Sequence, residues 1–94
     1  MDTLSKIALK IIQDQELIIG PLAWSEARKV PGLRVIDQKS GQIDFSDSNS
    51  TQVLDGLVNQ YERLFGRASR EVCREAAAPF LANLVPTEIP LSLK

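Results

Sequence analysis

The N-terminal part of the chain carries an apolar stripe of helical period. Within residues 3–17, apolar side chains recur at alternating spacings of three and one: Leu4, Ile7, Ala8, Ile11 and Ile12. Polar and charged side chains fall between them, as on a helix that buries one face. Asp2 or Thr3 suits the N-cap of this predicted helix. Gly20 suits its C-terminal end and Pro21 suits the first turn of another helix, so we expect a break between them.

The next stretch changes period. A short second helix is expected over residues 21–30, where Pro31-Gly32 stops it. Two alternating segments follow, at 33–35 and 43–45, and the letters QKSG between them supply turn chemistry. This pattern predicts a β-hairpin, which must pack on the helices because two strands alone are marginally stable.

Two more helices are expected in the second half of the chain. Asn49, followed three residues later by Gln52, resembles a capping arrangement at the start of the third helix. The apolar face of that helix consists of Val53, Leu54, Leu57, Val58, Tyr61, Leu64 and Phe65. After Gly66, a fourth helix is predicted to extend to about Ala78, where Pro79 ends or kinks it.

These elements predict an α+β fold dominated by helix. It has four to five short helices and one β-hairpin in the order α-α-β-β-α-α, and it becomes all-α if the hairpin is only a loop. Residues 1–85 are expected to form one compact helical domain, with the hairpin at about 33–45. Pro86 and Pro90 predict an extended tail over residues 86–94. A chain of 94 residues can hold one modest core without metal or disulfide staples.

Two stretches of the chain resemble each other, IIGPLAWSEARK and LFGRASREVCRE. Each has an apolar pair, a glycine, a small residue at the third position after the glycine and a basic residue at the eighth, and the offset between them is 46 residues. The offset lies in the range of two-helix repeats, although two units are fewer than a solenoid needs. Any helix–glycine–helix corner shares these features, so duplication and coincidence both remain open.

Composition narrows the classes of function. The chain has no histidine, the usual metal ligand and general base, and its single cysteine cannot form an internal disulfide. No apolar run approaches the roughly 20 residues of a membrane-spanning helix, and the charged N-terminus is unlike a signal peptide. A net charge of −1 argues against a general binder of duplex DNA. We therefore expect a soluble cytoplasmic protein that is not an enzyme, with no cofactor and no metal.

Four arginines form the most regular charged pattern, at spacings of four, three and four: Arg63, Arg67, Arg70 and Arg74. On a helix they share one face. The opposite, apolar face would consist of Ala68, Val72, Ala76 and Phe80. A solvated face with local Arg–Glu pairs is the favoured interpretation. The alternative is an anion or nucleic-acid site, because the guanidinium fork fits phosphate and carboxylate groups.

Two features could carry chemistry. Cys73 lies at the edge of that apolar face, and we expect it to pack as a small hydrophobe because no histidine is present to activate its thiol. Asp37 and Asp44 flank the hairpin turn and could approach each other across the strands. Two carboxylates alone do not make a metal site, so a structural role is favoured for both.

The remaining candidates are apolar. Trp24 is expected in the core, with an interface anchor as the alternative. In the tail, three apolar residues alternate and could pack on the body or dock on a partner: Ile89, Leu91 and Leu93.

Together these features predict a small non-catalytic protein–protein interaction module or accessory subunit. The tail and Trp24 would supply apolar contact, and the arginine face would orient the partner and speed association. The expected partner is a protein whose identity the sequence does not give. Binding of an anion or nucleic acid through the arginine helix face is the alternative, a membrane is not expected, and the oligomeric state is left open.

Overall fold

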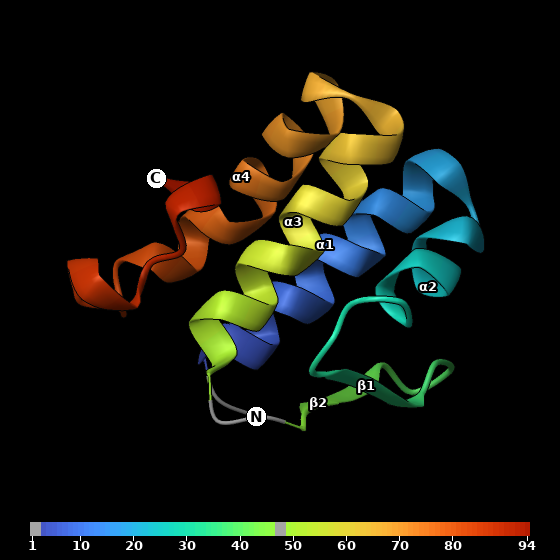
Figure 1. Cartoon of the computed structure of the whole chain (residues 1–94), viewed down its shortest axis with the longest axis horizontal. Coiled ribbons are helices and arrows are strands. Elements are labelled where there is room, and N and C mark those ends of the chain that lie inside the picture. Colours follow the sequence, from blue (N-terminus) through green and yellow to red (C-terminus); the bar gives the residue numbers. More distant parts are fainter. Residues whose placement is uncertain (1–2, 47–48) are drawn as a thin grey trace.

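The computed structural model describes residues 3–46 and 49–94, so Asp2, one of the two N-cap candidates, lies outside the described residues. The elements are, in chain order, α1 (Thr3–Ile19), α2 (Leu22–Ala27), β1 (Leu33–Asp37), β2 (Gln42–Phe45), α3 (Ser50–Phe65), α4 (Arg67–Leu81) and two 3-10 turns, η1 (Pro86–Glu88) and η2 (Leu91–Leu93) (Figure 1). The predicted helix-dominated α+β fold, with the order α-α-β-β-α-α, is confirmed.

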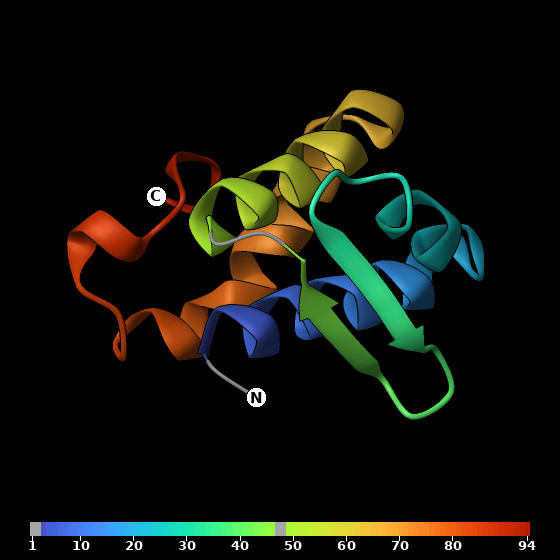
Figure 2. The ribbon, with the colours of Figure 1, turned by 60° about the horizontal axis from the view of Figure 1, so that its bottom comes forward.

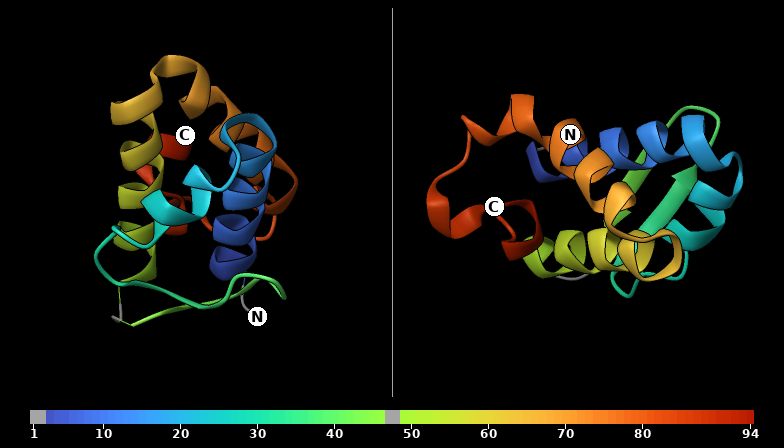
Figure 3. Two further views of the ribbon diagram at one scale, coloured as in Figure 1. Left: turned by 90° about the vertical axis from the view of Figure 1, so that its right-hand side faces the viewer. Right: turned by 90° about the horizontal axis from the view of Figure 1, so that it is seen from above.

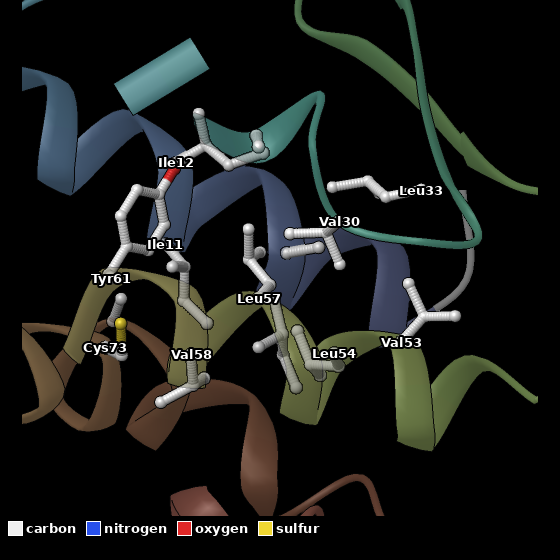
Figure 4. Packing of buried hydrophobic residues seen from close by; sticks show 14 of the residues in the cluster. Ile11, Ile12, Val30, Leu33, Val53, Leu54, Leu57, Val58, Tyr61 and Cys73 are labelled. Carbon is white, nitrogen blue, oxygen red and sulfur yellow. The ribbon is translucent and has the colours of Figure 1, made fainter. Parts of the chain in front are cut away.

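The core lies between the long helices. In Figures 1 and 3, α1 and α3 run side by side in the same direction, and α4 packs against both. The predicted stripe of α1 supplies Ile7, Ile11 and Ile12, which are fully buried. Leu57 and Val58 of α3 pack in the same cluster (Figure 4). Burying one such side chain stabilises the fold by about 1.5–3 kcal/mol, so the stripe accounts for much of the helix pairing.

The predicted hairpin is present and rests on the helices. β1 and β2 pair antiparallel, with Val35 opposite Ile43, and they cross beside α1 (Figure 2). Leu33 and Ile43 are buried in the common core. The turn also touches α1, since a Cβ atom at Gly41 would lie 3.3 Å from a methyl carbon of Leu9. These contacts supply the support that an isolated two-stranded sheet lacks.

Two predicted helix ends are wrong by about one turn. α2 ends at Ala27, because the amides of residues 29–30 bond three residues back and form a turn. α4 continues through Pro79 to Leu81. Proline removes one helical hydrogen bond, the one to the carbonyl of Glu75. Both residues lie on the exposed side of α4, so water can take that bond and the helix continues.

Residues 86–94 differ from the extended tail that the two prolines predicted. They form η1 and η2, and Leu93 is inserted against α3 and α4 with only 2% of its surface exposed. The Ser92 amide donates to Asp55 Oδ1 at 3.0 Å, and Thr51 Oγ1 donates to the Glu88 carbonyl at 3.3 Å. Proline fixes φ at a value that suits tight turns, and the resulting turns bring Leu93 back to the body.

The two stretches that resemble each other in sequence occupy equivalent places in the fold. We call residues 3–30 unit 1 and residues 49–76 unit 2. At an offset of 46 residues, buried positions of unit 1 match buried positions of unit 2. The matched positions are Ile7, Ala8, Ile11, Ile12, Gln15, Ala23, Ala27 and Val30 in unit 1, and Val53, Leu54, Leu57, Val58, Tyr61, Ser69, Cys73 and Ala76 in unit 2.

Each unit donates a buried side-chain hydrogen bond to a backbone carbonyl of the other. Gln15 Nε2 of unit 1 donates to the Ser69 carbonyl of unit 2 at 3.0 Å. Tyr61 Oη of unit 2 donates to the Ala23 carbonyl of unit 1 at 2.6 Å. The donors are related by the 46-residue offset, and so are the acceptors. This reciprocal exchange resembles the contact between two subunits related by a two-fold axis.

Candidate docking surface

The arginines of α4 have acidic neighbours. Arg70 lies 3.4 Å from a carboxylate oxygen of Glu62, and Arg74 lies 3.3 Å from one of Glu71. All four side chains are at least partly exposed, and ion pairs of this kind contribute little to stability. Part of the positive charge of this face is therefore balanced within the chain.

The other two arginines lie at the corner between α3 and α4. Arg63 donates to Gln60 Oε1 at 2.8 Å, and this acceptor is neutral. Arg67 is the first residue of α4 and forms no ion pair within residues 3–46 and 49–94. The first turn of α4 contains no acidic side chain. The two arginines of the row that form no ion pair among the described residues therefore both lie at this corner.

The buried face of α4 differs from the predicted one. Periodicity predicted Ala68, Val72, Ala76 and Phe80. The buried residues are Ser69, Cys73, Ala76 and Ala77, of which only Ala76 was predicted. The core face is displaced by about one position, or roughly 100° of rotation. The hydrogen bond from Gln15 to the Ser69 carbonyl fixes this rotation, and the small side chain of Ser69 lets α4 approach α1 closely.

Cys73 is buried and packs in the core as predicted. Its Sγ lies 3.5 Å from Gln15 Nε2, which donates to it. Burial raises the pKa of the Cys73 thiol to about 11. The thiol therefore stays protonated near neutral pH, and the thiolate, which is the reactive form, is not available.

Most of the predicted apolar contact residues lie within the molecule. Trp24 has 2% of its surface exposed and belongs to the core, as favoured from the sequence. In the tail, Leu93 is buried, Ile89 is half-buried and Leu91 is 74% exposed. Figure 1 places α2 and the tail on opposite sides of the molecule. These residues do not come together to form one surface.

The two hairpin carboxylates do not face each other. Asp44 is opposite Arg34, and the Arg34 guanidinium lies 2.6 Å from Asp44 Oδ2. Asp37 is opposite Gln42 and accepts a hydrogen bond from the Lys39 amide at 3.0 Å. The bond from Arg34 lowers the pKa of the Asp44 carboxyl. Within the described part of the chain, no three cysteine or acidic side chains gather as metal ligands would.

The exposed apolar side chains show a surface that the sequence interpretation missed. Four of the large ones lie where α1 meets α2 and where α3 meets α4, and we call them the corner patch: Leu17, Ile18, Leu22 and Leu64. Leu17 is 87% exposed and Ile18 is 63% exposed. The C-terminal ends of α1 and α3 lie at the same end of the molecule (Figures 1 and 3). The patch therefore draws on both units.

One signal in the sequence could have identified this surface. The letters ELIIGPL place Leu17 outside the apolar stripe of α1, next to Ile18 and directly before the helix break. Large apolar residues therefore stand on both sides of the break, Leu17 before it and Leu22 after it. An exposed turn usually carries polar residues at such positions. The corner patch is thus apolar on the unit 1 side, while Arg63 and Arg67 flank Leu64 on the unit 2 side.

The surface also contains hollows that could be considered as binding sites. One hollow, with a volume of about 430 Å³, lies between the start of α3 and the tail and is lined by residues that include Thr51, Asp55, Ile89 and Pro90. Its lining contains one carboxylate, that of Asp55, which accepts from the Ser92 amide, and one amine, that of Lys94. None of the described helices combines the length and the apolar character needed to cross a bilayer.

Comparison with known proteins adds no assignment to this geometry. The chain matches no protein-family model, no curated protein and no solved structure.

Proposed function

We propose that this protein is a non-catalytic protein–protein interaction module, or an accessory subunit, that docks its partner on the corner patch. The observation that supports the proposal is the exposure of Leu17, Ile18, Leu22 and Leu64, which lie in the last turns of α1 and α3 and at the start of α2. Large exposed apolar patches on small proteins mark interaction sites. A cytoplasmic location is part of the proposal, because an unpaired thiol such as that of Cys73 suits a reducing compartment.

The mechanism is docking without chemistry. Covering one large aliphatic side chain contributes about 1.5–3 kcal/mol before the costs of association are subtracted. Arg63 and Arg67 at the edge of the patch would speed the encounter with a partner of opposite charge. From the sequence, the tail and Trp24 were expected to supply the apolar contact with the partner. In the present proposal the corner patch supplies it. The rest of the arginine face keeps its proposed orienting role.

The test compares two double variants that each remove two exposed apolar side chains. Leu17→Ser/Ile18→Ser removes the most exposed part of the corner patch. Ile36→Ser/Val85→Ser removes two side chains that are each 56% exposed and lie elsewhere. Each protein is immobilised and used to capture interactors from its native cells, and the captured proteins are quantified by mass spectrometry. We expect some proteins to be captured by the wild type and by the control, Ile36→Ser/Val85→Ser. The same proteins should not be captured by Leu17→Ser/Ile18→Ser.

Two results would contradict the proposal. If both variants capture the same proteins as the wild type, the corner patch is not the docking site. If capture instead depends on nucleic acid, is lost on nuclease treatment and falls steeply with salt, the arginine face binds nucleic acid and the alternative function holds. Circular dichroism of both variants, run alongside, shows that a loss of capture is not a loss of fold.

A further inference from the structure

The corner patch has two sides of different character, and this determines what can cover it. We propose that its partner is an amphipathic helix whose apolar stripe is bordered by acidic side chains. This inference rests on the proposed function and adds the chemistry of the partner. An amphipathic helix presents an apolar stripe and a charged edge side by side, and docking such a helix on an apolar surface is a common recognition mode.

The apolar side fits the stripe of such a helix. Leu17 and Ile18 are consecutive on the last turns of α1, and Leu22 begins α2 just after the break. All three are exposed, so they project from one short corner instead of packing inward. A partner that left these side chains in water would gain no binding free energy from them. A purely polar partner would lose binding free energy, because its own polar groups would be desolvated against them. The contact on this side therefore has to be apolar.

The charged side calls for acids. Arg63 and Arg67 are exposed on either side of Leu64, and neither forms an ion pair within the described residues. The nearby Glu62 is already paired with Arg70. Arg67 also lies at the first position of α4, where the helix dipole disfavours a cation. Carboxylates of the partner would pair with these two guanidinium groups.

A second copy of the chain fits less well. A two-fold contact through the corner patch would place the same surface against itself. Such a contact would place the guanidinium groups of Arg63 and Arg67 in one of two environments. Near those of the other copy, like charges across the interface are costly; against its apolar side, they would lose water without gaining a carboxylate. Charge complementarity therefore favours a different, acidic chain.

The test uses two synthetic peptides and the full-length chain. Both peptides are designed as amphipathic helices with the same leucine stripe, one bordered by glutamates and the other by lysines, and each carries a fluorescent label. Binding is measured by fluorescence anisotropy at low and at moderate salt. We expect the glutamate peptide to bind about three- to tenfold more tightly than the lysine peptide, the effect of two exposed ion pairs.

Variants locate the contact and its charge. In Arg63→Glu/Arg67→Glu the preference should reverse toward the lysine peptide, while Arg74→Glu, on the same face but away from the corner, should leave the preference unchanged. Leu17→Ser/Ile18→Ser should weaken both peptides. Reversal by the corner pair alone would support the inference, because a general effect of net charge would also appear with Arg74→Glu.

Each other outcome would overturn the inference in a recognisable way. Equal affinity for the two peptides, with loss in Leu17→Ser/Ile18→Ser, would reject the acidic border and leave the proposed function intact. Binding of neither peptide would reject the helical partner, and cellular capture would still test docking. A dimer by ultracentrifugation that Leu17→Ser/Ile18→Ser dissociates would assign the patch to a second copy. Corner-dependent binding to phosphatidylserine vesicles or to a single-stranded oligonucleotide would assign it to a membrane surface or to nucleic acid.

Discussion

Unit 1 and unit 2 share a buried framework and differ where they face outward. At the offset of 46 residues, Leu17 of unit 1 corresponds to Arg63 of unit 2, and Pro21 corresponds to Arg67. All four positions are exposed. The same corner of the same framework is therefore apolar in one unit and cationic in the other. The matched positions hold the helices together, and the unmatched positions are free to form a two-sided surface.

The two reciprocal hydrogen bonds also differ in quality. Tyr61 has one polar side-chain atom, and its hydroxyl is bonded to the Ala23 carbonyl. Burial raises the pKa of this phenol, so it stays protonated and able to donate. Gln15 has two polar side-chain atoms, and its Oε1 is buried with no partner among the described residues. An unpaired buried acceptor costs about 1–3 kcal/mol, so the bond from unit 1 carries a penalty that the bond from unit 2 lacks.

The largest expected effects on stability come from replacing the glycines at the two corners, one in each unit. Gly66 has φ 87° and ψ −172°, a region that is essentially restricted to glycine. Gly20 has φ 69°, and its amide bonds to the Glu16 carbonyl at 2.9 Å, as in a left-handed helix cap. Gly66→Ala should lower the free energy of unfolding by about 2–3 kcal/mol, and Gly20→Ala by about 1–2 kcal/mol.

Urea denaturation of the two variants checks this order. A Cβ atom at either glycine would meet nothing within 4 Å, so the comparison isolates backbone strain from steric overlap. Gly20→Asn serves as the matched control, because asparagine tolerates the left-handed region, and it should lose less than Gly20→Ala. A larger loss at Gly20 than at Gly66 would show that the two corners do not differ as described.

The buried donors provide the second difference. Tyr61→Phe should lower the free energy of unfolding by about 1 kcal/mol, the net value of one hydrogen bond. Gln15→Met removes the bonded Nε2 together with the unpaired Oε1, so we expect a change close to zero. Thermal unfolding of both variants, followed by circular dichroism, measures the contrast. If Gln15→Met costs as much as Tyr61→Phe, the glutamine is fully satisfied and the two bonds are equivalent.

The sequence predicted the framework well because burial follows periodicity. The stripe of α1, the glycine breaks and the Asn49 cap, whose side chain accepts from the Gln52 amide at 3.1 Å, all depend on residues close in the chain. The element order followed from these local signals. The resemblance between the two stretches was visible as well, but its meaning depended on which residues meet across the core.

The missed features depend on contacts between distant residues. Ser69 was not among the residues predicted for the buried face of α4, yet it is buried, and Gln15, 54 residues away, donates to its carbonyl. Leu93 was placed in an extended tail that could pack on the body or dock on a partner, and its contacts with α3 and α4 decide for the body. Leu17 and Ile18 lie in the last turn of α1 and remain exposed among the described elements. Periodicity identifies an apolar face, but only the packed neighbours decide which residues remain outside.

The smallest expected difference between the units is in how their stability depends on pH. Glu26 of unit 1 accepts from Gln60 Nε2 at 2.7 Å and from Lys29 Nζ at 3.1 Å, whereas the equivalent residue of unit 2 is Val72. These bonds, that from Gln60 first, hold the pKa of the Glu26 carboxyl below its ordinary value of 4.5. The folded state thus favours the charged carboxylate. Its contribution is complete above the unfolded-state pKa and is lost as the pH falls through the folded-state pKa.

Glu26→Gln tests this dependence, because the amide keeps the shape of the side chain and cannot titrate. Between about pH 5 and about pH 3, the urea midpoint of the wild type should fall more steeply than that of the variant. The effect is small because Lys29 is largely exposed and solvent weakens its pairing. Val72→Ala is the control at the equivalent position of unit 2, and it should shift the midpoint equally at every pH. Parallel pH profiles for the wild type and Glu26→Gln would show that the bonds from Gln60 and Lys29 do not favour the charged carboxylate. The position of Glu26 in unit 1 would then be as insensitive to pH as the equivalent position of Val72 in unit 2.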